Sequence, residues 1–179
     1  PDLIWVKLSR NDVGDAAVKK LQGWVDSGGV LWLSTDLASQ FGFPLTTAPG
    51  SDRTAWAVVA RTTLHPVLDG IRAESKIAFE ITPDRKLISG VASELARRMT
   101  LILGWPDRTG RRLFVACAIR TQNSGTVVFR PENIDTSTGP GRKLKENLRD
   151  WSLKASHPSS EKPKPSEEES PPAKKATEE

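Results

Sequence analysis

A helix, a glycine pair and a buried strand follow one another between Asn11 and Asp36, in the segment NDVGDAAVKKLQGWVDSGGVLWLSTD. The helix is predicted by apolar residues that recur every three or four positions and form one face: Val13, Ala17, Leu21 and Trp24. Asn11 or Asp12 is expected to cap its start, because their side chains accept hydrogen bonds from backbone N–H groups. Glycine adopts a left-handed turn at little cost, so the Gly28-Gly29 pair is expected to end it. This order of elements is typical of a layered α/β domain.

The strand predicted at Val30–Leu33 is apolar throughout, as expected for a parallel strand that is covered on both faces. Ser34, Thr35 and Asp36 follow at its carboxyl end, which is the edge where ligands bind in open α/β sheets. Ser34 and Asp36 are therefore candidate ligand-binding residues. The alternative, favoured for Asp36, is that it caps a short helix over Leu37–Phe41.

The remaining chain predicts further short strands and one final helix. Strands are expected at Asp2–Leu8, Trp56–Ala60, Lys76–Ile81, Met99–Leu103, Arg112–Ile119 and Gly125–Arg130. Phe43–Asp52 is expected to be a loop, and Leu87–Leu95 is open between a helix and an irregular crossing. The last helix is predicted over Arg142–Leu153, and the preceding Gly139–Lys143 segment is expected to be a plain turn or, less favourably, an anion site at the helix N-terminus. Short turns between the late strands favour antiparallel pairing, so the sequence predicts a parallel first half with an antiparallel extension.

The chain is expected to fold over residues 1–151 and to end in a tail at 152–179. The tail consists largely of Ser, Pro, Glu, Lys and Ala, which cannot bury enough apolar surface to offset the entropy of ordering, so it is predicted to be disordered. No apolar run approaches the ~20 residues that cross a bilayer. Since the chain starts at Pro1, membrane attachment would require flanking sequence outside it, and its compartment stays open.

Composition argues against several classes of function. The formal net charge of +4 is modest and the arginines are scattered along the sequence, which does not favour a nucleic-acid-binding protein. Cys117 is the one cysteine, and its apolar setting, LFVACAIR, favours a small buried side chain over a nucleophile. With so few cysteines and histidines, no metal site is expected. No phosphate-binding glycine motif is present, and no cofactor is expected.

Three segments carry a family resemblance: LQGWVDSGGVLWLSTD at Leu21–Asp36, HPVLDGI at His65–Ile71, and GTVVFRPENID with NLRDW at Gly125–Asp135 and Asn147–Trp151. In this order the chain resembles bacterial domains of unknown function in the class I glutamine amidotransferase-like superfamily, related to trehalose-utilisation-type domains. The resemblance covers most of residues 1–151. It implies a three-layer, flavodoxin-like α/β fold, and it also implies that the first β-α unit of the fold precedes Pro1, so that the chain is N-terminally truncated.

The chain departs from the amidotransferase pattern at the nucleophile. The family pattern has a Gly-x-Cys-x-Gly elbow, whereas Cys117 lies between Ala116 and Ala118. A tight elbow needs small neighbours that expose the sulfur, and the middle of a strand does not provide this. The resemblance thus implies the fold without glutaminase activity. We expect a non-catalytic module of a larger bacterial protein that binds an unidentified small molecule or protein partner.

The alternative is a hydrolase that uses His65 with carboxylates at the carboxyl edge of the sheet. Its candidate catalytic residues are His65, Asp36 and Asp135, and Asn133 is a further ligand-binding candidate. A structural turn at His65-Pro66 is favoured over this role, because the residue before a proline adopts an extended conformation. The six tryptophans are expected to be mostly core, with Trp5, Trp24 and Trp32 inside predicted elements.

Overall fold

The computed structural model describes residues 3–47, 54–59, 65–80 and 86–156. The expected tail at 152–179 therefore falls largely outside the described residues, although its first part, through Ser156, belongs to the last helix. The helices are α1 (Asp15–Asp26), α2 (Ala92–Arg98) and α3 (Gly139–Ser156), with short 3-10 turns η1 (Arg10–Asp12), η2 (Asp36–Phe41) and η3 (Pro66–Leu68). The strands are β1 (Leu3–Val6), β2 (Val30–Leu33), β3 (Leu45–Thr47), β4 (Thr54–Val59), β5 (Lys76–Glu80), β6 (Lys86–Gly90), β7 (Thr100–Pro106), β8 (Leu113–Gln122) and β9 (Gly125–Phe129). In these ranges no helix has the length and apolar content to cross a bilayer.

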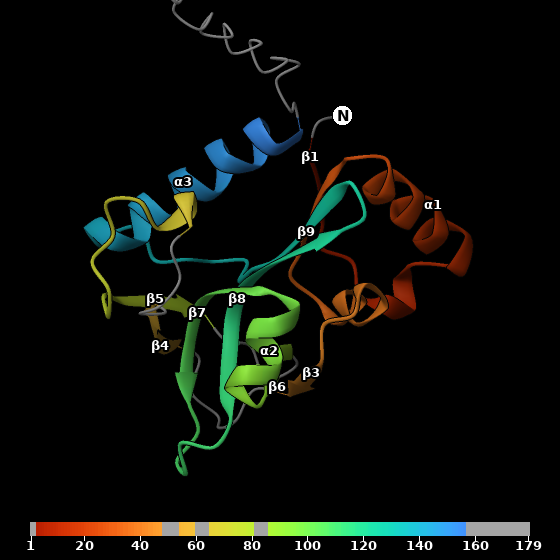
Figure 1. The fold of residues 1–179 in the computed structure, drawn as a ribbon. Coiled ribbons are helices and arrows are strands. Elements are labelled where there is room, and N and C mark those ends of the chain that lie inside the picture. The colour runs from red at the N-terminus through yellow and green to blue at the C-terminus, as the bar shows by residue number, and fades with distance from the viewer. Residues whose placement is uncertain (1–2, 48–53, 60–64, 81–85, 157–179) are drawn as a thin grey trace, which may run out of the picture.

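All nine described strands belong to one mixed sheet (Figure 1). Its main path runs β1-β2-β9-β8-β7-β4-β5, while β6 joins β8 and carries β3 on its other side. The pairs β1–β2 and β2–β9 are parallel, and the pairs involving β3 to β8 are antiparallel. The predicted parallel β1-α1-β2 unit and the antiparallel late strands are confirmed. The division into a parallel first half and an antiparallel second half is wrong, because β3 and β4 pair antiparallel and β9, late in the chain, pairs parallel with β2.

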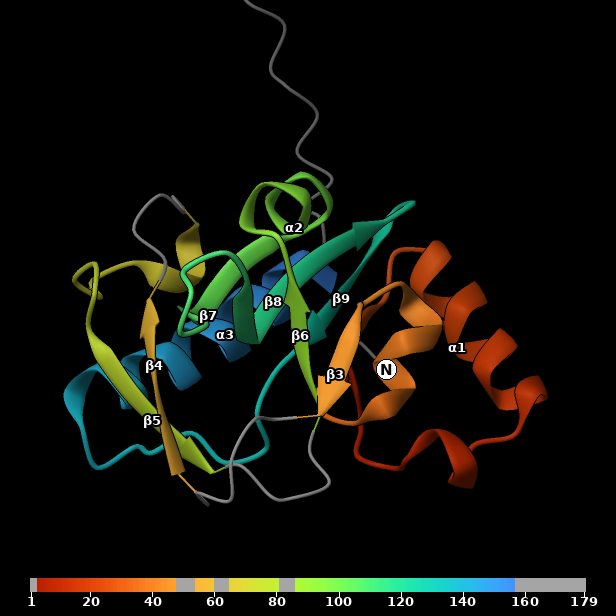
Figure 2. The same cartoon turned by 90° about the horizontal axis from the view of Figure 1, so that it is seen from below.

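Helices cover both faces of the sheet, which makes the domain a layered α/β structure (Figures 1 and 2). Because side chains alternate along a strand, the residues of β2 divide between the two faces. Val30 and Trp32 pack in one cluster with Leu144 and Leu148 of α3. Leu31 and Leu33 pack in the other, whose helical members include Val18 and Val25 of α1, Leu37 and Phe41 of η2, and Leu95 of α2. Because both faces are covered, all four residues of β2 are buried, as its apolar composition predicted.

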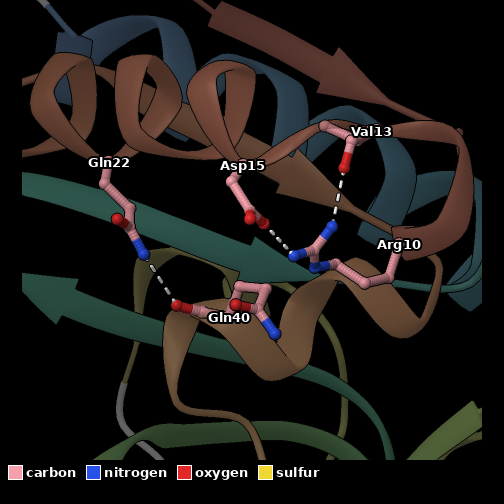
Figure 3. Close-up of polar contacts among 5 residues, drawn as sticks. All are labelled: Arg10, Val13, Asp15, Gln22 and Gln40. Atoms are coloured by element: carbon pink, nitrogen blue, oxygen red, sulfur yellow. Dashed lines mark hydrogen bonds and ion pairs between the residues drawn. The ribbon is translucent and has the colours of Figure 1, made fainter.

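The start of α1 differs from the sequence prediction. Asn11 and Asp12 lie in the separate turn η1, and the N-cap of α1 is Gly14, which supplies no capping side chain. The turn is held by the guanidinium of Arg10, which donates to the Val13 carbonyl at 2.7 Å and pairs with Asp15 at the first position of α1 (Figure 3). Arg10 thus links the turn η1 to the first residue of α1.

The buried face of α1 is also shifted from the predicted stripe. Ala17 is exposed, and Val18 and Val25 are the buried residues of the helix. The helix ends as expected at the glycine pair, where Gly28 has a φ of 109°. Gln22 extends from the helix to donate to the Gln40 carbonyl in η2 at 3.1 Å, which fixes the two segments together (Figure 3).

Two segments were assigned incompletely from sequence. The expected loop at Phe43–Asp52 contains β3, which pairs with β6 from Leu45↔Ile88 to Thr47↔Lys86. The open segment Leu87–Leu95 is a strand followed by a helix, β6 and α2, with Gly90 ending the strand. Both are short elements whose patterns become clear only through their pairing partners, because β3 has three residues and α2 has seven.

Candidate functional site

The carboxyl ends of the three parallel strands bring tryptophan and cationic side chains to one face of the sheet. In the register of the sheet, Trp5 of β1 lies beside Trp32 of β2. Side chains two residues further along point to the same face, so Lys7, Ser34 and Arg130 form the next row, just beyond the strand ends. Arg130 follows β9 directly, and its backbone N–H continues the ladder by donating to the Leu33 carbonyl at 2.9 Å.

The two tryptophans and two cations form a compact stack. The ring centroids of Trp5 and Trp32 are 5.8 Å apart, with an edge-to-face angle of 72°. The guanidinium carbon of Arg130 lies 4.7 Å from the Trp5 centroid and 4.8 Å from the Trp32 centroid. The Lys7 ammonium lies 4.0 Å from the Trp5 centroid. These distances fall within the range of cation–π attraction, so the aromatic rings hold positive charge at this edge.

Arg130 is almost fully buried, with 2% of its surface exposed. Its Nε donates to the Pro131 carbonyl at 2.9 Å and its Nη2 donates to the Glu132 carbonyl at 3.2 Å. These bonds satisfy part of the cost of burying a guanidinium and fix its orientation over the rings. Arg130 is therefore a fixed positive charge at the base of the site.

A pocket of about 420 Å³ opens above this stack, between the sheet edge and α3. Its base consists of Trp5, Trp32 and Arg130, and its wall consists of Thr136, Arg142, Lys145, Glu146 and Arg149. The volume lies within the usual range for small-molecule sites. Four of the lining side chains are cationic and one is anionic, so the pocket carries a net positive charge. Trp5 is 37% exposed, which corrects its expected place in the core and leaves part of its ring accessible.

The wall is a charged stripe along α3. Arg142, Lys145 and Arg149 are spaced three and four residues apart, so they project from one side of the helix. Three residues spaced in this way span roughly 10 Å along the helix axis at ~1.5 Å per residue. Arg149 also pairs with its neighbour Asp150 at 3.0 Å. The guanidinium of Arg142 donates to the Thr136 carbonyl at 3.4 Å.

Packing under α3 fixes this stripe against the sheet. Leu144 and Leu148 are completely buried, and the Trp32 indole N–H donates to the Ser152 hydroxyl at 2.9 Å. At the start of the helix, Gly141 lies so close to the chain before it that a Cβ would approach the Asp135 carbonyl oxygen to 1.9 Å. A glycine is therefore required where the 130–138 segment turns into α3, and the expected turn at Gly139–Lys143 is the first turn of this helix.

Among the predicted ligand-binding residues, Ser34 is the one that lies in the same row of the sheet as Arg130. Ser34 is buried, and its hydroxyl donates to a carboxylate oxygen of Glu132 at 3.4 Å. Asp36 begins η2, but its carboxylate does not cap that turn; it accepts a bond of 2.7 Å from the backbone N–H of Arg10. Asn133 lies over β5, where its side-chain amide donates to Glu80 at 2.8 Å. The three residues thus make contacts with three different segments.

The predicted hydrolase residues also have separate partners. His65 caps η3, with its Nδ1 accepting from the Val67 N–H at 3.2 Å, and its ring packs against Trp151 with centroids 4.8 Å apart. Desolvation by burial lowers the pKa of His65 below its usual value. Asp135 accepts from the Ser137 N–H at 2.8 Å, and hydrogen bonding to Ser137 lowers the pKa of its carboxyl. In the described part of the chain, no hydrogen bond joins His65, Asp36 and Asp135.

Cys117 is completely buried in β8, as expected for a small core side chain. Desolvation raises the pKa of its thiol to about 12, and the nearby charge of Arg130 opposes this shift only in part. The thiol is thus protonated at neutral pH. A search of the described ranges finds no group of three or more His, Cys, Asp or Glu side chains that could hold a metal ion.

Sequence reasoning missed the base of the pocket, although its elements left a signal; the less favoured anion site at Gly139–Lys143 does include Arg142 of the wall. Trp5 was assigned to the core because it lies in an apolar strand, and Arg130 was the last residue of a predicted strand. The repeated pattern of an aromatic or apolar residue followed two positions later by a polar one, Trp5/Lys7, Trp32/Ser34 and Val128/Arg130, indicates a shared face at the strand ends. The pattern gains meaning only once the three strands are known to be parallel neighbours.

No protein-family model matches this chain, and no curated protein sequence matches it either. Among solved structures, the chain is similar to a β-galactosidase from Rahnella sp. R3, with a TM-score of 0.50 and 9% identity over 85% of this chain. It spans 23% of the length of that β-galactosidase. A cytoplasmic protein from Salmonella typhimurium has a TM-score of 0.48 and 12% identity, over 84% of this chain and 71% of that one. The likeness to the Rahnella protein concerns the fold alone and supports a mixed α/β domain.

Proposed function

We propose that this chain is a non-catalytic ligand-binding module of a larger bacterial protein, and that it binds a small organic anion in the pocket between the sheet edge and α3. The fold proposed for it is the flavodoxin-like fold of the class I glutamine amidotransferase-like superfamily. A layered α/β sheet with parallel strands at β1, β2 and β9 supports this finer assignment.

One observation carries the proposal: four cations line a pocket at the carboxyl edge of the parallel strands, against one carboxylate. Ligands of open α/β sheets bind at this edge. Guanidinium groups are well matched to carboxylate and phosphate groups, with which they form paired, charge-assisted hydrogen bonds. A small organic anion thus fits both the charge and the size of the site.

The surroundings of the candidate nucleophile support a binding role over catalysis. The Cys117 thiol is buried in the middle of β8 and is protonated at neutral pH, which makes it a poor nucleophile. His65 is engaged with the Val67 N–H and with Trp151, and neither contact activates a nucleophile or a water molecule. These contacts do not favour the alternative hydrolase.

The proposal is tested by titrating the whole chain with citrate and with inorganic phosphate at constant ionic strength. Isothermal titration calorimetry gives the affinity, and tryptophan fluorescence reports on the pocket because Trp5 and Trp32 form its base. We expect the double variant Arg142→Ala/Arg149→Ala to bind the probe at least about tenfold more weakly, since each lost charge-assisted bond contributes about 1.5–3 kcal/mol.

Lys154→Ala is the matched control, because Lys154 is an exposed cation of α3 that does not line the pocket. It is expected to leave the affinity unchanged. Saturable binding that is the same in the double variant and in the control would contradict the proposed site. The absence of saturable binding for both probes would contradict the proposed class of ligand.

A further inference from the structure

A second cationic region lies at the other end of the molecule, on the hairpin that joins β7 to β8. Figure 1 shows this hairpin extending away from α3, with its tip at the bottom of the view. The last paired residues are Pro106 and Leu113, so the tip consists of Asp107–Arg112. Three of its residues are exposed arginines: Arg108, Arg111 and Arg112.

Asp107 holds this arginine tip in one conformation. Its carboxylate accepts bonds from the backbone N–H groups of Thr109 at 3.2 Å, Arg111 at 3.0 Å and Arg112 at 3.3 Å. Its backbone closes the loop by donating to the Arg112 carbonyl at 2.8 Å, and Gly110 supplies the positive φ of 69° that the turn requires. Desolvation alone would raise the pKa of Asp107, but the bonds from Thr109, Arg112 and Arg111 lower it on balance. The carboxylate therefore stays ionised and engaged while the three arginines remain exposed.

A groove of about 310 Å³ adjoins the tip, between the hairpin and α2. We call it the arginine groove, because Arg98 of α2 and Arg112 of the tip both line it. Its apolar part includes Pro44, Val91 and Leu95, and Val91 is 45% exposed. Glu94 adds one carboxylate to the lining.

The arginines of this region lack acceptors in the part of the chain that the structure describes. Among the described residues, the side chains of Arg98, Arg108, Arg111 and Arg112 make no hydrogen bond or ion pair. A loop whose backbone is already ordered and that presents guanidinium groups is partly preorganised for an anionic partner, because the backbone loses little further freedom on binding.

We propose that the arginine groove and tip dock an acidic, extended segment of a partner protein. Carboxylates of the segment pair with Arg98 and Arg112, and an apolar side chain of the segment covers Val91 and Pro44. Arg111 and Arg108 extend the cationic surface along the hairpin, so the segment continues toward the tip.

The lining favours a protein segment over a nucleic acid. Exposed Val91 gains nothing beside a phosphate backbone but is buried by an apolar side chain. Glu94 would repel a continuous row of phosphates, whereas it can accept bonds from the backbone N–H groups of a peptide. Mixed apolar and arginine surfaces of this kind are typical of protein–protein contacts.

The test is fluorescence anisotropy on the whole chain with a labelled peptide of alternating Glu and Leu. A peptide of alternating Gln and Leu serves as the neutral probe, and single-stranded oligothymidylate serves as the nucleic-acid probe. We expect saturable binding of the acidic peptide, weakened about tenfold or more in Arg98→Ser/Arg112→Ser because two charge-assisted contacts are lost. Arg97→Ser is the matched control, since Arg97 is an exposed neighbour on α2 that does not line the groove, and it is expected to bind as the wild type does.

Three outcomes would overturn the proposal. Equal binding of the neutral peptide would show that charge does not select the partner. An equal loss of peptide affinity in Arg97→Ser would show general attraction to a basic surface. Oligothymidylate that binds more tightly than the acidic peptide, and that loses affinity in Arg98→Ser/Arg112→Ser, would assign the groove to nucleic acid. Arg142→Ala/Arg149→Ala, which changes the pocket at α3, is expected to leave peptide binding unchanged. This variant therefore distinguishes the arginine groove from the α3 pocket. Circular dichroism spectra of all variants establish that they are folded.

Discussion

The indole N–H of Trp32 donates to the hydroxyl of Ser152 across 2.9 Å, and both residues are buried. The bond joins the middle of the parallel sheet to the last helix, which are separated by 120 positions in the chain. Trp32 also forms the base of the pocket, while α3 forms its wall. Together with the packing of Leu144 and Leu148, this contact holds the two sides of the proposed binding site against each other.

Replacing Ser152 with alanine should leave the Trp32 N–H buried without an acceptor. Such a group costs about 1–3 kcal/mol, so the free energy of unfolding measured in urea should fall by that amount. Ser156→Ala is the control, because the Ser156 hydroxyl donates to the Leu153 carbonyl at an exposed site, and its cost should stay below about 0.5 kcal/mol. Equal costs in the two variants would mean that the indole finds another acceptor.

His65 should make stability depend on pH in the acid range. Its pKa is lowered in the folded chain by desolvation, so its contribution to stability is present above the unfolded value of 6.5 and is lost as pH falls below it. Protonation would also remove the Nδ1 acceptor that caps η3. His65→Asn keeps a capping acceptor but does not titrate.

As pH falls from about 7 to about 5, the urea midpoint of the wild type should therefore fall relative to that of His65→Asn. His157 is present in both proteins and cancels in the comparison. A difference that does not change with pH would show that folding does not lower the pKa of His65.

The sequence predicted those elements whose structure depends on a short stretch of residues and the turns beside it. The strand Val30–Leu33 was predicted with its observed bounds, because four apolar residues lie between a glycine pair and a polar triplet. The β8–β9 hairpin and the turn at His65-Pro66 followed from local turn residues in the same way. These signals need no knowledge of the rest of the fold.

Prediction failed where side-chain contacts beyond the local pattern decide the outcome. The helix cap was assigned to Asn11 or Asp12, but these residues lie in η1, where Arg10 bonds Val13 and Asp15, and the helix begins at Asp15 after Gly14. Asp36 was expected to cap η2, but its carboxylate accepts from the Arg10 N–H.

The pocket could not be predicted for the same reason. Trp5, Arg130 and Arg149 come from two strand ends and a helix, and only the parallel register and the packing of α3 bring them together. The predicted sites Ser34, Asp36 and Asn133 were chosen from one strand end and one loop, so they missed the wall that α3 supplies. The disordered tail remains a prediction beyond Ser156, because residues 157–179 lie outside the described ranges.

Cys117 should cause a loss of stability at alkaline pH. Burial raises its pKa from 9.0 to about 12 in the folded chain, so the unfolded thiol ionises first as pH rises. Its contribution is complete below pH 9.0 and is lost as pH rises from there toward about 12. The slope is at most about 1.4 kcal/mol per pH unit. Cys117→Ala should lack this component, so the difference between the two proteins in urea unfolding should narrow above pH 9.0. A constant difference would show that the thiol reaches solvent.

Glu146 should weaken the binding of anions, because it is the one carboxylate among the lining side chains of the pocket. Glu146→Gln keeps the shape of the side chain and removes its charge, so the affinity for citrate should rise about twofold to fivefold, the range expected for one exposed charge pair. The effect should shrink as salt is added, because mobile ions screen an exposed charge. Glu94→Gln provides the comparison, since it removes the same charge from the arginine groove and should leave citrate binding unchanged. If both variants raise the affinity equally, citrate responds to the net charge of the whole chain and the α3 pocket is not its site.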